Sequence, residues 1–549
     1  MRRLGAHLRR LLPGPRDYTG LRRSWRRDLL AGLTVGIVAL PLALGFGISS
    51  GAGAEAGLIT AIVAGVVAAV FGGSNVQVSG PTGAMVVVLA PIVASHGLGA
   101  VAVVSILAGI LVLAAGVLRL GRAVSVIPWP VIEGFTLGIA VIIFLQQVPA
   151  LTGPATRGSH GNVVVEAVTA LGNADPLYLL WALAAVAIIA ACMLLLPRLH
   201  RAIPGSLVGI VVVTLLTLVL PDPLAAIGAL PHSLPLPAFP AFGLADLPGL
   251  LLPALTVAAL AAIESLLSAR VAASLADTGP YDPDRELVGQ GLASVAAGLF
   301  GGMPATGAIA RTAVNVRSGA ATRVAAITHA VILLLVVVAA AGPVGAIPLA
   351  ALAGVLMVTA LRMVHLATVR SILRSTRADA AAFVITALIT VSVDLIVAVV
   401  IGMIVAGVFA LRSLSRATGV HREEIDGEPQ PHDDRIAIIR LDGPLFFAAA
   451  DRVLDAVTAV GGVSVVILRM SQLELVDATG AHVLSEIVHR LEARGVTVLI
   501  KGIREGHTEL FRTVGVLDAL RDQRHLFDDL PSAIAHARSH TAREAAAAG

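Results

Sequence analysis

Long apolar runs dominate the first 415 residues of the chain and decide what it can fold into. Roughly 20 consecutive apolar residues let a helix cross the hydrocarbon core of a bilayer, and runs of about this length recur between residues 29 and 413. Of all 549 residues, 57% are hydrophobic and 13% are charged, and the mean hydropathy is +0.90. This composition is typical of a polytopic membrane protein and excludes a water-soluble domain of this size.

The apolar runs predict fourteen helical segments in two sets of seven. The first set is expected at 29–48, 56–71, 82–95, 98–118, 124–148, 177–197 and 203–220, and the second at 250–273, 287–302, 305–316, 321–341, 348–367, 380–392 and 394–413. Arginines gather before the first segment and after the fourth, sixth, eighth, tenth and twelfth, whereas the long loop 221–249 has no lysine or arginine. By the positive-inside rule, both ends of the chain are expected in the cytoplasm.

Two of these segments are short and begin at a break that contains proline and glycine. One break is 79–85 (SGPTGAM) and the other is 301–311 (GGMPATGAIAR). Proline suits the first turn of a helix, and glycines interrupt the helix before it. In hydrocarbon, such a break persists only where it is buried in protein or lines a cavity. Ordinary proline kinks are the alternative.

A helix start at membrane depth has free N–H groups and the positive end of the helix dipole, so each break predicts an anion site. Two interrupted helices at corresponding places in two halves of a chain indicate a secondary transporter with inverted repeats.

Two ionisable residues lie inside the apolar runs. Glu264 follows the apolar stretch 258–263, and Arg311 is expected about one and a half turns into the segment 305–316. A charge near the bilayer centre costs about 2.5–3.5 kcal/mol on insertion scales, so each is a functional candidate. Arg311 is expected to add positive potential for an anion, and Glu264 to carry a proton. A purely structural ion pair between the two is the alternative.

The character of the chain changes after residue 415. Residues 416–434 are polar and predict a linker. Short strand patterns at 435–441, 463–469 and 496–500 alternate with helical patterns at 479–494 and 507–521, which is typical of a soluble α/β domain. We expect this domain at 435–537 and a disordered tail at 538–549.

Several classes of function are excluded by composition. The single cysteine, Cys192, rules out a disulfide framework and a cysteine-based metal site. No nucleophile–base pair and no metal cluster is evident, so we expect neither an enzyme nor a cofactor. The net charge of +4 reflects membrane topology, and no nucleic-acid partner is expected.

Taken together, these features resemble the SulP (sulfate permease) anion transporters, which carry a C-terminal STAS domain. The motifs that carry the resemblance are 28–36, 41–46, 130–136, 264–267 and 304–315 in the apolar part, and 476–480 in the soluble domain. The resemblance implies fourteen transmembrane segments in two inverted seven-segment repeats, a core domain and a gate domain. It also implies an elevator-type movement and a homodimer.

The resemblance also implies a set of site residues. In the family the substrate lies between the facing N-termini of the third and tenth helices, here Pro81, Thr82, Gly83 and Ala84 on one side and Ala305, Thr306, Gly307 and Ala308 on the other. Phe46 matches an aromatic residue that faces the same cavity, and Arg311 matches a position that is basic in some members. Relatives that use sodium have an acid and a hydroxyl at the spacing of Glu264 and Ser268, so the coupling ion is H⁺ or Na⁺. In the STAS domain, Asp477 and Thr479 match a regulatory motif in which the threonine can be phosphorylated.

The sequence therefore predicts a secondary active anion transporter of the bacterial inner membrane. Sulfate is the default substrate of the family, and C4-dicarboxylates and bicarbonate stay open. Expected partners are the anion, membrane lipid, a second copy of the chain and a cytoplasmic protein that binds STAS. The alternatives are a non-transporting membrane-anchored STAS signalling protein, a nucleobase permease of the same architecture and an uncoupled anion channel.

Overall fold

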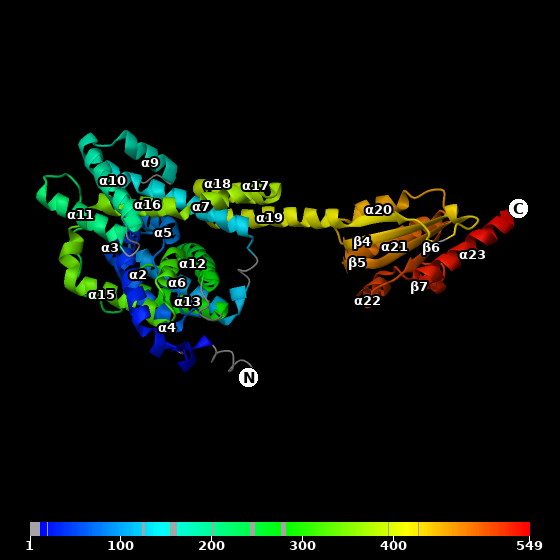
Figure 1. Ribbon diagram of the computed structural model, residues 1–549, viewed down its shortest axis with the longest axis horizontal. Coiled ribbons are helices and arrows are strands. Elements are labelled where there is room, and N and C mark those ends of the chain that lie inside the picture. The colour runs from blue at the N-terminus through cyan, green and yellow to red at the C-terminus, as the bar shows by residue number, and fades with distance from the viewer. Residues whose placement is uncertain are drawn as a thin grey trace. The chain divides into compact units, whose positions relative to one another are not determined.

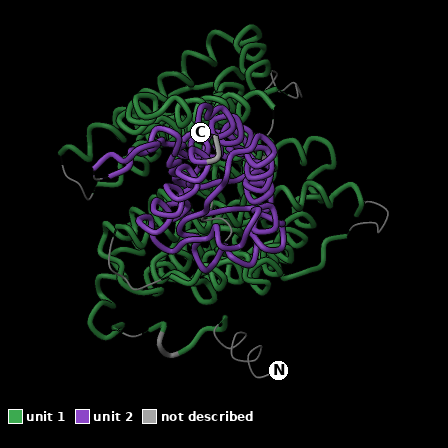
Figure 2. The backbone as a smooth tube through the Cα atoms, turned by 90° about the vertical axis from the view of Figure 1, so that its right-hand side faces the viewer, with its two compact units in different colours: residues 1–403 green, residues 404–549 purple. Residues whose placement is uncertain are grey.

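The structure is a computed structural model that describes residues 11–18, 20–122, 127–153, 162–199, 203–241, 247–275, 281–393, 395–426 and 428–548 (Figure 1). The chain divides into two compact units, Met1–Met403 and Ile404–Gly549, which Figure 2 distinguishes by colour. The first unit is helical, and the second contains a five-stranded sheet. Each is described here by itself.

The first half of the helical unit contains η1 (Pro15–Tyr18), α2 (Leu21–Ser49), α3 (Ala54–Ile59), the π-helical turn η2 (Thr60–Ala64), α4 (Gly65–Phe71), β1 (Ser79–Gly80), α5 (Gly83–His96), α6 (Gly99–Val117), α7 (Trp129–Gln146), α8 (Val148–Thr152), α9 (Val163–Gly172), α10 (Pro176–Leu199) and α11 (Gly205–Val219). The second half contains α12 (Leu247–Leu275), α13 (Pro283–Leu299), β2 (Thr306–Gly307), α14 (Ile309–Arg317), α15 (Val324–Gly345), α16 (Leu349–Met363), α17 (Leu366–Arg374), α18 (Arg377–Ser392) and α19 (Leu395–Ala417).

Each of the fourteen expected apolar segments is occupied by a helix. The structure adds three short helices, α8, α9 and α17, which the apolar pattern did not predict. Among the described residues, nine helices are long and apolar enough to cross a membrane, and α5 and α11 are shorter apolar helices. The chain is therefore a polytopic helical membrane protein, as its composition predicted.

The start of the tenth segment differs from the sequence expectation. A helix was expected from residue 305, but α14 begins at Ile309. The preceding residues are extended because they pair with the other break: β1 and β2 are antiparallel, with Ser79 opposite Gly307 and Gly80 opposite Thr306. This two-stranded ribbon holds the starts of α5 and α14 side by side, although they come from opposite halves of the chain.

Helices α6 and α13 pack closely through glycines. A Cβ atom placed on Gly109 would lie 2.7 Å from the carbonyl oxygen of Gly291, and one placed on Gly116 would lie 2.7 Å from that of Asp284. Both obstacles are backbone atoms, which no side-chain rotation can move. Small residues at such contacts let membrane helices approach until their backbones touch.

Replacing Gly109 by alanine should therefore separate α6 from α13. We expect a loss of about 1–3 kcal/mol in the free energy of unfolding, the usual effect of overpacking, measured as a lower thermal midpoint of the purified protein. Gly99 lies on the same helix with no atom within 4 Å of a Cβ placed there. The matched change Gly99→Ala should leave the midpoint unchanged, and an equal effect of the two changes would contradict the packing argument.

A buried carboxylate fastens α2 to the beginning of α15. The Oδ1 atom of Asp28 accepts hydrogen bonds from the backbone N–H of Ala321 at 2.7 Å and of Thr322 at 3.1 Å, and Oδ2 accepts from the hydroxyls of Ser24 and Thr322, both at 2.7 Å. Four donors satisfy this carboxylate, as burial of a charge requires.

The second unit is an α/β domain. Its sheet has the order β3-β4-β5-β6-β7, and its strands are β3 (Gly419–Glu423), β4 (Ile436–Leu445), β5 (Val465–Val476), β6 (Thr497–Lys501) and β7 (Leu526–Phe527). Strand β3 is antiparallel to β4, and the other neighbours are parallel. The helices are α20 (Ala450–Thr458), α21 (Ala478–Ala493), α22 (Glu505–Val514) and α23 (Leu530–Ala548), with η5 (Asp433–Arg435) and η6 (Gln523–His525) as short turns.

The two faces of this sheet are covered by different helices. Along β4, Ile439 and Leu441 pack in one core with residues of α20, α21 and α22, whereas Ile436 and Ile438 pack in another with Ala537 of α23. Successive side chains of a strand point to opposite faces of the sheet. Helix α23 therefore covers one face, and α20, α21 and α22 cover the other.

Two expectations about this unit are wrong. The expected linker 416–434 contains strand β3, and the expected disordered tail 538–549 continues helix α23 as far as Ala548. Side-chain pairing explains the second difference. Arg538 donates two hydrogen bonds to Asp433 at 2.9 and 2.8 Å, which lowers the pKa of that carboxyl below its ordinary value of 3.8, and Arg435 contacts Glu544 at 3.0 Å.

Candidate functional site

The candidate site is built around two helix starts that the β1–β2 ribbon holds together. Helix α5 begins after Thr82, and α14 begins after Ala308. The first hydrogen bonds inside these helices run from Val86 N–H to the Thr82 carbonyl at 3.3 Å and from Thr312 N–H to the Ala308 carbonyl at 2.9 Å. In the described part of the chain, the N–H groups of 83–85 and 309–311 have no hydrogen-bond acceptor. They are the free donors that make a helix start an anion site.

Helix α12 packs against both β2 and α14 and brings Glu264 to these starts. The Oε2 atom of Glu264 accepts a hydrogen bond from the Thr82 hydroxyl at 2.7 Å. Thr306 and Arg311 complete the electrostatic surroundings of this carboxylate. The Glu264 side chain is partly exposed, whereas Thr82, Thr306 and Arg311 are buried. The two predicted threonines and the two predicted ionisable residues therefore share one cluster.

Arg311 lies closer to the helix start than its sequence position suggested. It is the third residue of α14 and not one and a half turns into a helix, because α14 begins at Ile309. Its Nη2 donates to the Pro81 carbonyl at 2.5 Å, and its side chain is only 2% exposed. Its Nη1 is buried without a hydrogen-bond partner among the residues that the structure describes. A cation in the first turn opposes the helix dipole, so α14 itself does not account for this residue.

The structural alternative for Glu264 and Arg311 was a fixed ion pair. Their closest described partners are instead Thr82 and the Pro81 carbonyl, and no salt bridge within 4.0 Å joins the two side chains. Threonine at the residue before a helix often caps it, but the Thr82 hydroxyl makes no capping hydrogen bond. The Thr82 hydroxyl instead points to the Glu264 carboxylate, which lies in the other half of the unit.

The expected backbone donors before α14 are already occupied. Ala305 N–H donates to the Ser294 hydroxyl at 3.2 Å, Gly307 N–H to the Ser265 hydroxyl at 3.0 Å, and Ala308 N–H to the Val78 carbonyl at 2.9 Å. The expectation that these three residues offer free N–H groups is wrong, since the extended chain uses them to hold the ribbon. The free groups lie further along, at Ile309, Ala310 and Arg311.

The start of α5 agrees better with the sequence expectation. Gly83 is its first residue, and Ala84 follows with a 1% exposed side chain. A Cβ atom on Gly83 would lie 2.1 Å from Ile143 Cδ1 and 3.4 Å from Phe46 Cε1. A larger residue at this position would require the Ile143 side chain to move, and Phe46 lies beside the helix start.

Ser268 does not join Glu264. Its hydroxyl is fully buried and donates to the Thr312 hydroxyl at 3.1 Å, which in turn accepts from Val78 N–H at 3.0 Å. The residue on α12 that reaches the ribbon is Ser265, whose hydroxyl also lies 3.2 Å from that of Thr306. Thr312 and not Glu264 is thus the described partner of Ser268, and a role of Ser268 in ion coupling stays a prediction.

Several polar residues that surround the β1–β2 ribbon were not predicted from the sequence. Gln290 Nε2 donates to the Ser79 hydroxyl at 2.5 Å, and Gln77 Nε2 donates to the Ser265 carbonyl at 3.2 Å. The hydroxyl of Thr60, in the π-helical turn η2, accepts from Met303 N–H at 2.8 Å. These residues share one feature that the sequence does show: each has an amide or hydroxyl group in or next to an apolar segment. Burial of such a group costs free energy unless it is hydrogen-bonded.

In the second unit, Asp477 caps helix α21. Its carboxylate accepts from Gly480 N–H at 2.7 Å and from Phe447 N–H at 3.2 Å. Thr479 lies in the first turn with an exposed side chain. Asp477 thus has a structural role in the helix start, and phosphorylation of Thr479 stays a prediction.

Comparisons with known proteins agree with this architecture. The family model "Sulfate permease family" matches residues 25–386, and that of the STAS domain matches residues 430–533. The chain is 35% identical to a putative sulfate transporter, YvdB, of Bacillus subtilis, over 92% of this chain and 96% of that protein. It is 31% identical to the bicarbonate transporter BicA of a Synechocystis strain, over 87% of this chain and 88% of that one.

Two solved structures extend the comparison to the fold. The structure of SLC26A9 has a TM-score of 0.80 at 16% identity, covering 95% of this chain and 92% of that one. The transmembrane domain of a cyanobacterial BicA has a TM-score of 0.61 at 32% identity, covering 70% of this chain and 98% of that one. The first family match lies in the helical unit and the second lies in the α/β unit. The chain therefore belongs to the sulfate permease family of anion transporters and carries a STAS domain after its helical unit.

Proposed function

We propose that this protein is a secondary active transporter that binds a small oxyanion at the starts of α5 and α14. The observation that carries the proposal is the buried guanidinium of Arg311, whose Nη1 has no partner, beside two helix starts with free N–H groups. A buried donor of this kind costs free energy unless something satisfies it. An oxyanion would accept from Nη1 and from the backbone donors together.

Sulfate is the first candidate substrate, with bicarbonate and C4-dicarboxylates as the others. The relative from Bacillus is described as a putative sulfate transporter and the one from Synechocystis as a bicarbonate transporter. The donors proposed for this site are mostly backbone N–H groups, which bind any oxyanion of suitable size. Substrate choice therefore depends on the shape left by Phe46 and Ile143 beside Gly83.

Glu264 is the proposed coupling residue, with H⁺ or Na⁺ as the coupling ion. Its carboxylate accepts from Thr82, the residue that directly precedes α5, so its charge state acts directly on the start of that helix. A carboxylate amid apolar helices is a functional candidate by default. When a cation binds Glu264, the added positive charge would favour the anion at the same site, which would couple the two movements.

Movement, assembly and location complete the proposal. We place the chain in a bacterial inner membrane with both ends in the cytoplasm, as the arginine pattern favours. Two inverted seven-segment repeats would form a core domain, which holds the site, and a gate domain, with elevator-type exchange between them. A homodimer and a cytoplasmic partner of the STAS domain belong to the same proposal.

The test is uptake of radiolabelled anion into proteoliposomes. Sulfate, bicarbonate and fumarate are each offered with an imposed H⁺ gradient, an imposed Na⁺ gradient or none. Accumulation of one anion that depends on one gradient supports the proposal and identifies both substrate and ion. Ionic current without any gradient requirement would indicate a channel. If folded protein moves no anion but retains a partner on its STAS domain, the signalling alternative replaces the transporter.

Removing the hydroxyl of Thr82 tests the contact between the anion site and the coupling residue. Valine has the shape of threonine without its donor, so Thr82→Val leaves the partly buried Glu264 carboxylate without its 2.7 Å partner. Such a loss is worth about 0.5–1.5 kcal/mol, and we expect the uptake rate to fall about 3- to 10-fold. Thr82→Ser keeps the donor and should transport like the wild type; equal rates for valine and serine would contradict the role of this contact.

A further inference from the structure

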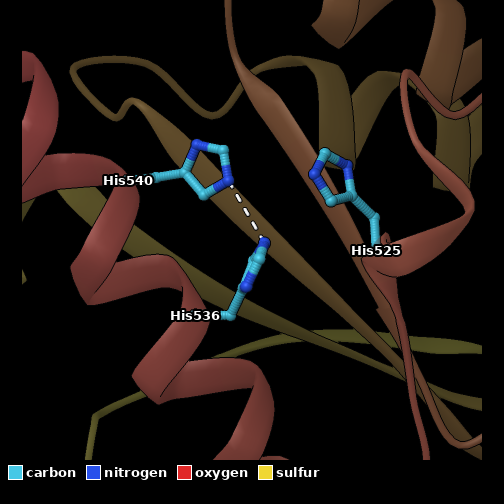
Figure 3. A group of neighbouring side chains, drawn as sticks. All are labelled: His525, His536 and His540. Carbon is cyan, nitrogen blue, oxygen red and sulfur yellow. Dashed lines mark hydrogen bonds between the residues drawn. The ribbon is translucent and has the colours of Figure 1, made fainter.

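Three histidines of the STAS domain converge on one point, which the sequence analysis did not anticipate. His536 and His540 lie one turn apart on α23, and His525 ends the turn η6 that precedes β7. One ring nitrogen from each lies within 4.8 Å of the others. Figure 3 shows the rings of His536 and His540 facing one another, with the ring of His525 turned toward them.

The spacing of the two helical nitrogens fits a metal ion. The Nε2 atoms of His536 and His540 are 3.2 Å apart. Two imidazole nitrogens bound to one tetrahedral zinc at about 2.0–2.1 Å lie roughly 3.3–3.4 Å apart. Histidines at positions i and i+4 of a helix lie on the same face, an arrangement by which helices bind zinc.

The third histidine, His525, brings a ring nitrogen to the same place. The His525 side chain is only 6% exposed. Its ring centroid lies 5.6 Å from that of His536 and 5.6 Å from that of His540. A third imidazole at this distance would complete a set of three nitrogen ligands around one metal ion.

The charged groups around the cluster are compatible with a cation. Asp522, Glu492 and Glu544 act on these histidines, as do Arg521 and Arg543. Two of the carboxylates are already paired, Glu492 with Arg521 and Glu544 with Arg435. Asp522 accepts from Arg524 N–H at 3.0 Å within its own turn. The carboxylates are thus held beside the cluster and leave the imidazoles as the ligands.

We propose that His525, His536 and His540 bind one zinc ion, with a water molecule as the fourth ligand. Imidazole suits Zn²⁺ among the common divalent ions, and three histidines with an open position form a known class of zinc site. The ion would join the β7 side of the sheet to α23, which covers one face of it. This site lies in the second unit and is independent of the proposed transport function.

The experiment measures zinc bound to the full-length protein, purified with a tag that contains no histidine. After incubation with Zn²⁺ and dialysis, elemental analysis should find one zinc per chain in the wild type. His536→Gln/His540→Gln should lose this equivalent. His482 and His489 are exposed histidines on α21, so His482→Gln/His489→Gln removes the same number of imidazoles from the same unit and should retain it.

Cobalt gives a second measurement that does not depend on any variant. Co²⁺ in a tetrahedral site absorbs visible light far more strongly than hydrated Co²⁺, and the wild type should show this spectrum until Zn²⁺ displaces it. Absence of the tetrahedral spectrum from folded wild-type protein would overturn the proposal. So would equal zinc contents of the wild type and His536→Gln/His540→Gln, because surface histidines would then account for the binding.

Discussion

In the variant Glu264→Gln, anion uptake is expected to become independent of the ion gradient that drives the wild type. Glutamine keeps an oxygen that accepts from the Thr82 hydroxyl, so the 2.7 Å contact and the start of α5 are preserved. It cannot change its charge, and a carrier that cannot bind and release its coupling cation cannot use the gradient. Net accumulation should therefore fall about 5- to 150-fold, the equivalent of a coupling free energy of about 1–3 kcal/mol between two binding sites, whereas exchange of labelled for unlabelled anion should persist.

The two modes of transport are measured on the same proteoliposomes. Accumulation is followed with and without the imposed gradient, and exchange with equal anion on both sides. The control is Glu133→Gln, which alters a glutamate of α7 whose described contact is a hydrogen bond from Trp129 Nε1 at 3.1 Å. It should behave like the wild type. If Glu264→Gln accumulates anion with unchanged dependence on the gradient, Glu264 has only a structural role.

The arrangement of helices was predictable because it follows from local properties of the sequence. Apolar length fixed the positions of the membrane segments, and proline and glycine fixed the interruptions at 79–85 and 301–311. The start of α14 was not predictable in the same way. This start depends on the pairing of Gly80 with Thr306, a contact between opposite halves of the chain that has no local sequence pattern. Because of this pairing the helix begins at Ile309 and not at residue 305.

The candidate site also combines residues that local sequence reveals with residues that only contacts between distant parts of the chain reveal. Glu264 and Arg311 could be found from the sequence because an ionisable side chain in an apolar segment is costly wherever it points. The hydroxyls of Ser265 and Thr312 could not, since serine and threonine are tolerated throughout membrane helices and only the fold shows that they reach the ribbon. The histidines of α23 were missed for another reason: the disordered tail was expected to begin at residue 538, which separated His536 from His540, whereas α23 is one helix that carries both on one face.

Arg311 is the residue whose loss should weaken anion binding most. It is a buried cation beside the two helix starts, its Nη2 donates to the Pro81 carbonyl, and its Nη1 has no partner among the described residues. A hydrogen bond to a charged group is worth about 1.5–3 kcal/mol, so Arg311→Gln should raise the KM for the anion about 10- to 150-fold. Arg317 ends the same helix with an exposed side chain, and Arg317→Gln, which removes an equal charge, should leave KM unchanged.

The hydrogen bond to Pro81 makes a structural explanation of the same result possible, and Arg311→Lys separates the two. Lysine retains the positive charge but loses the forked geometry of the guanidinium. If Arg311 acts on the anion mainly through charge, the lysine variant should recover most of the affinity. If its task is only to hold the Pro81 carbonyl, the glutamine variant should unfold at a lower temperature and keep the wild-type KM in the fraction that remains folded. That outcome would remove the observation on which the anion site rests, because the unpartnered Nη1 would then serve no ligand.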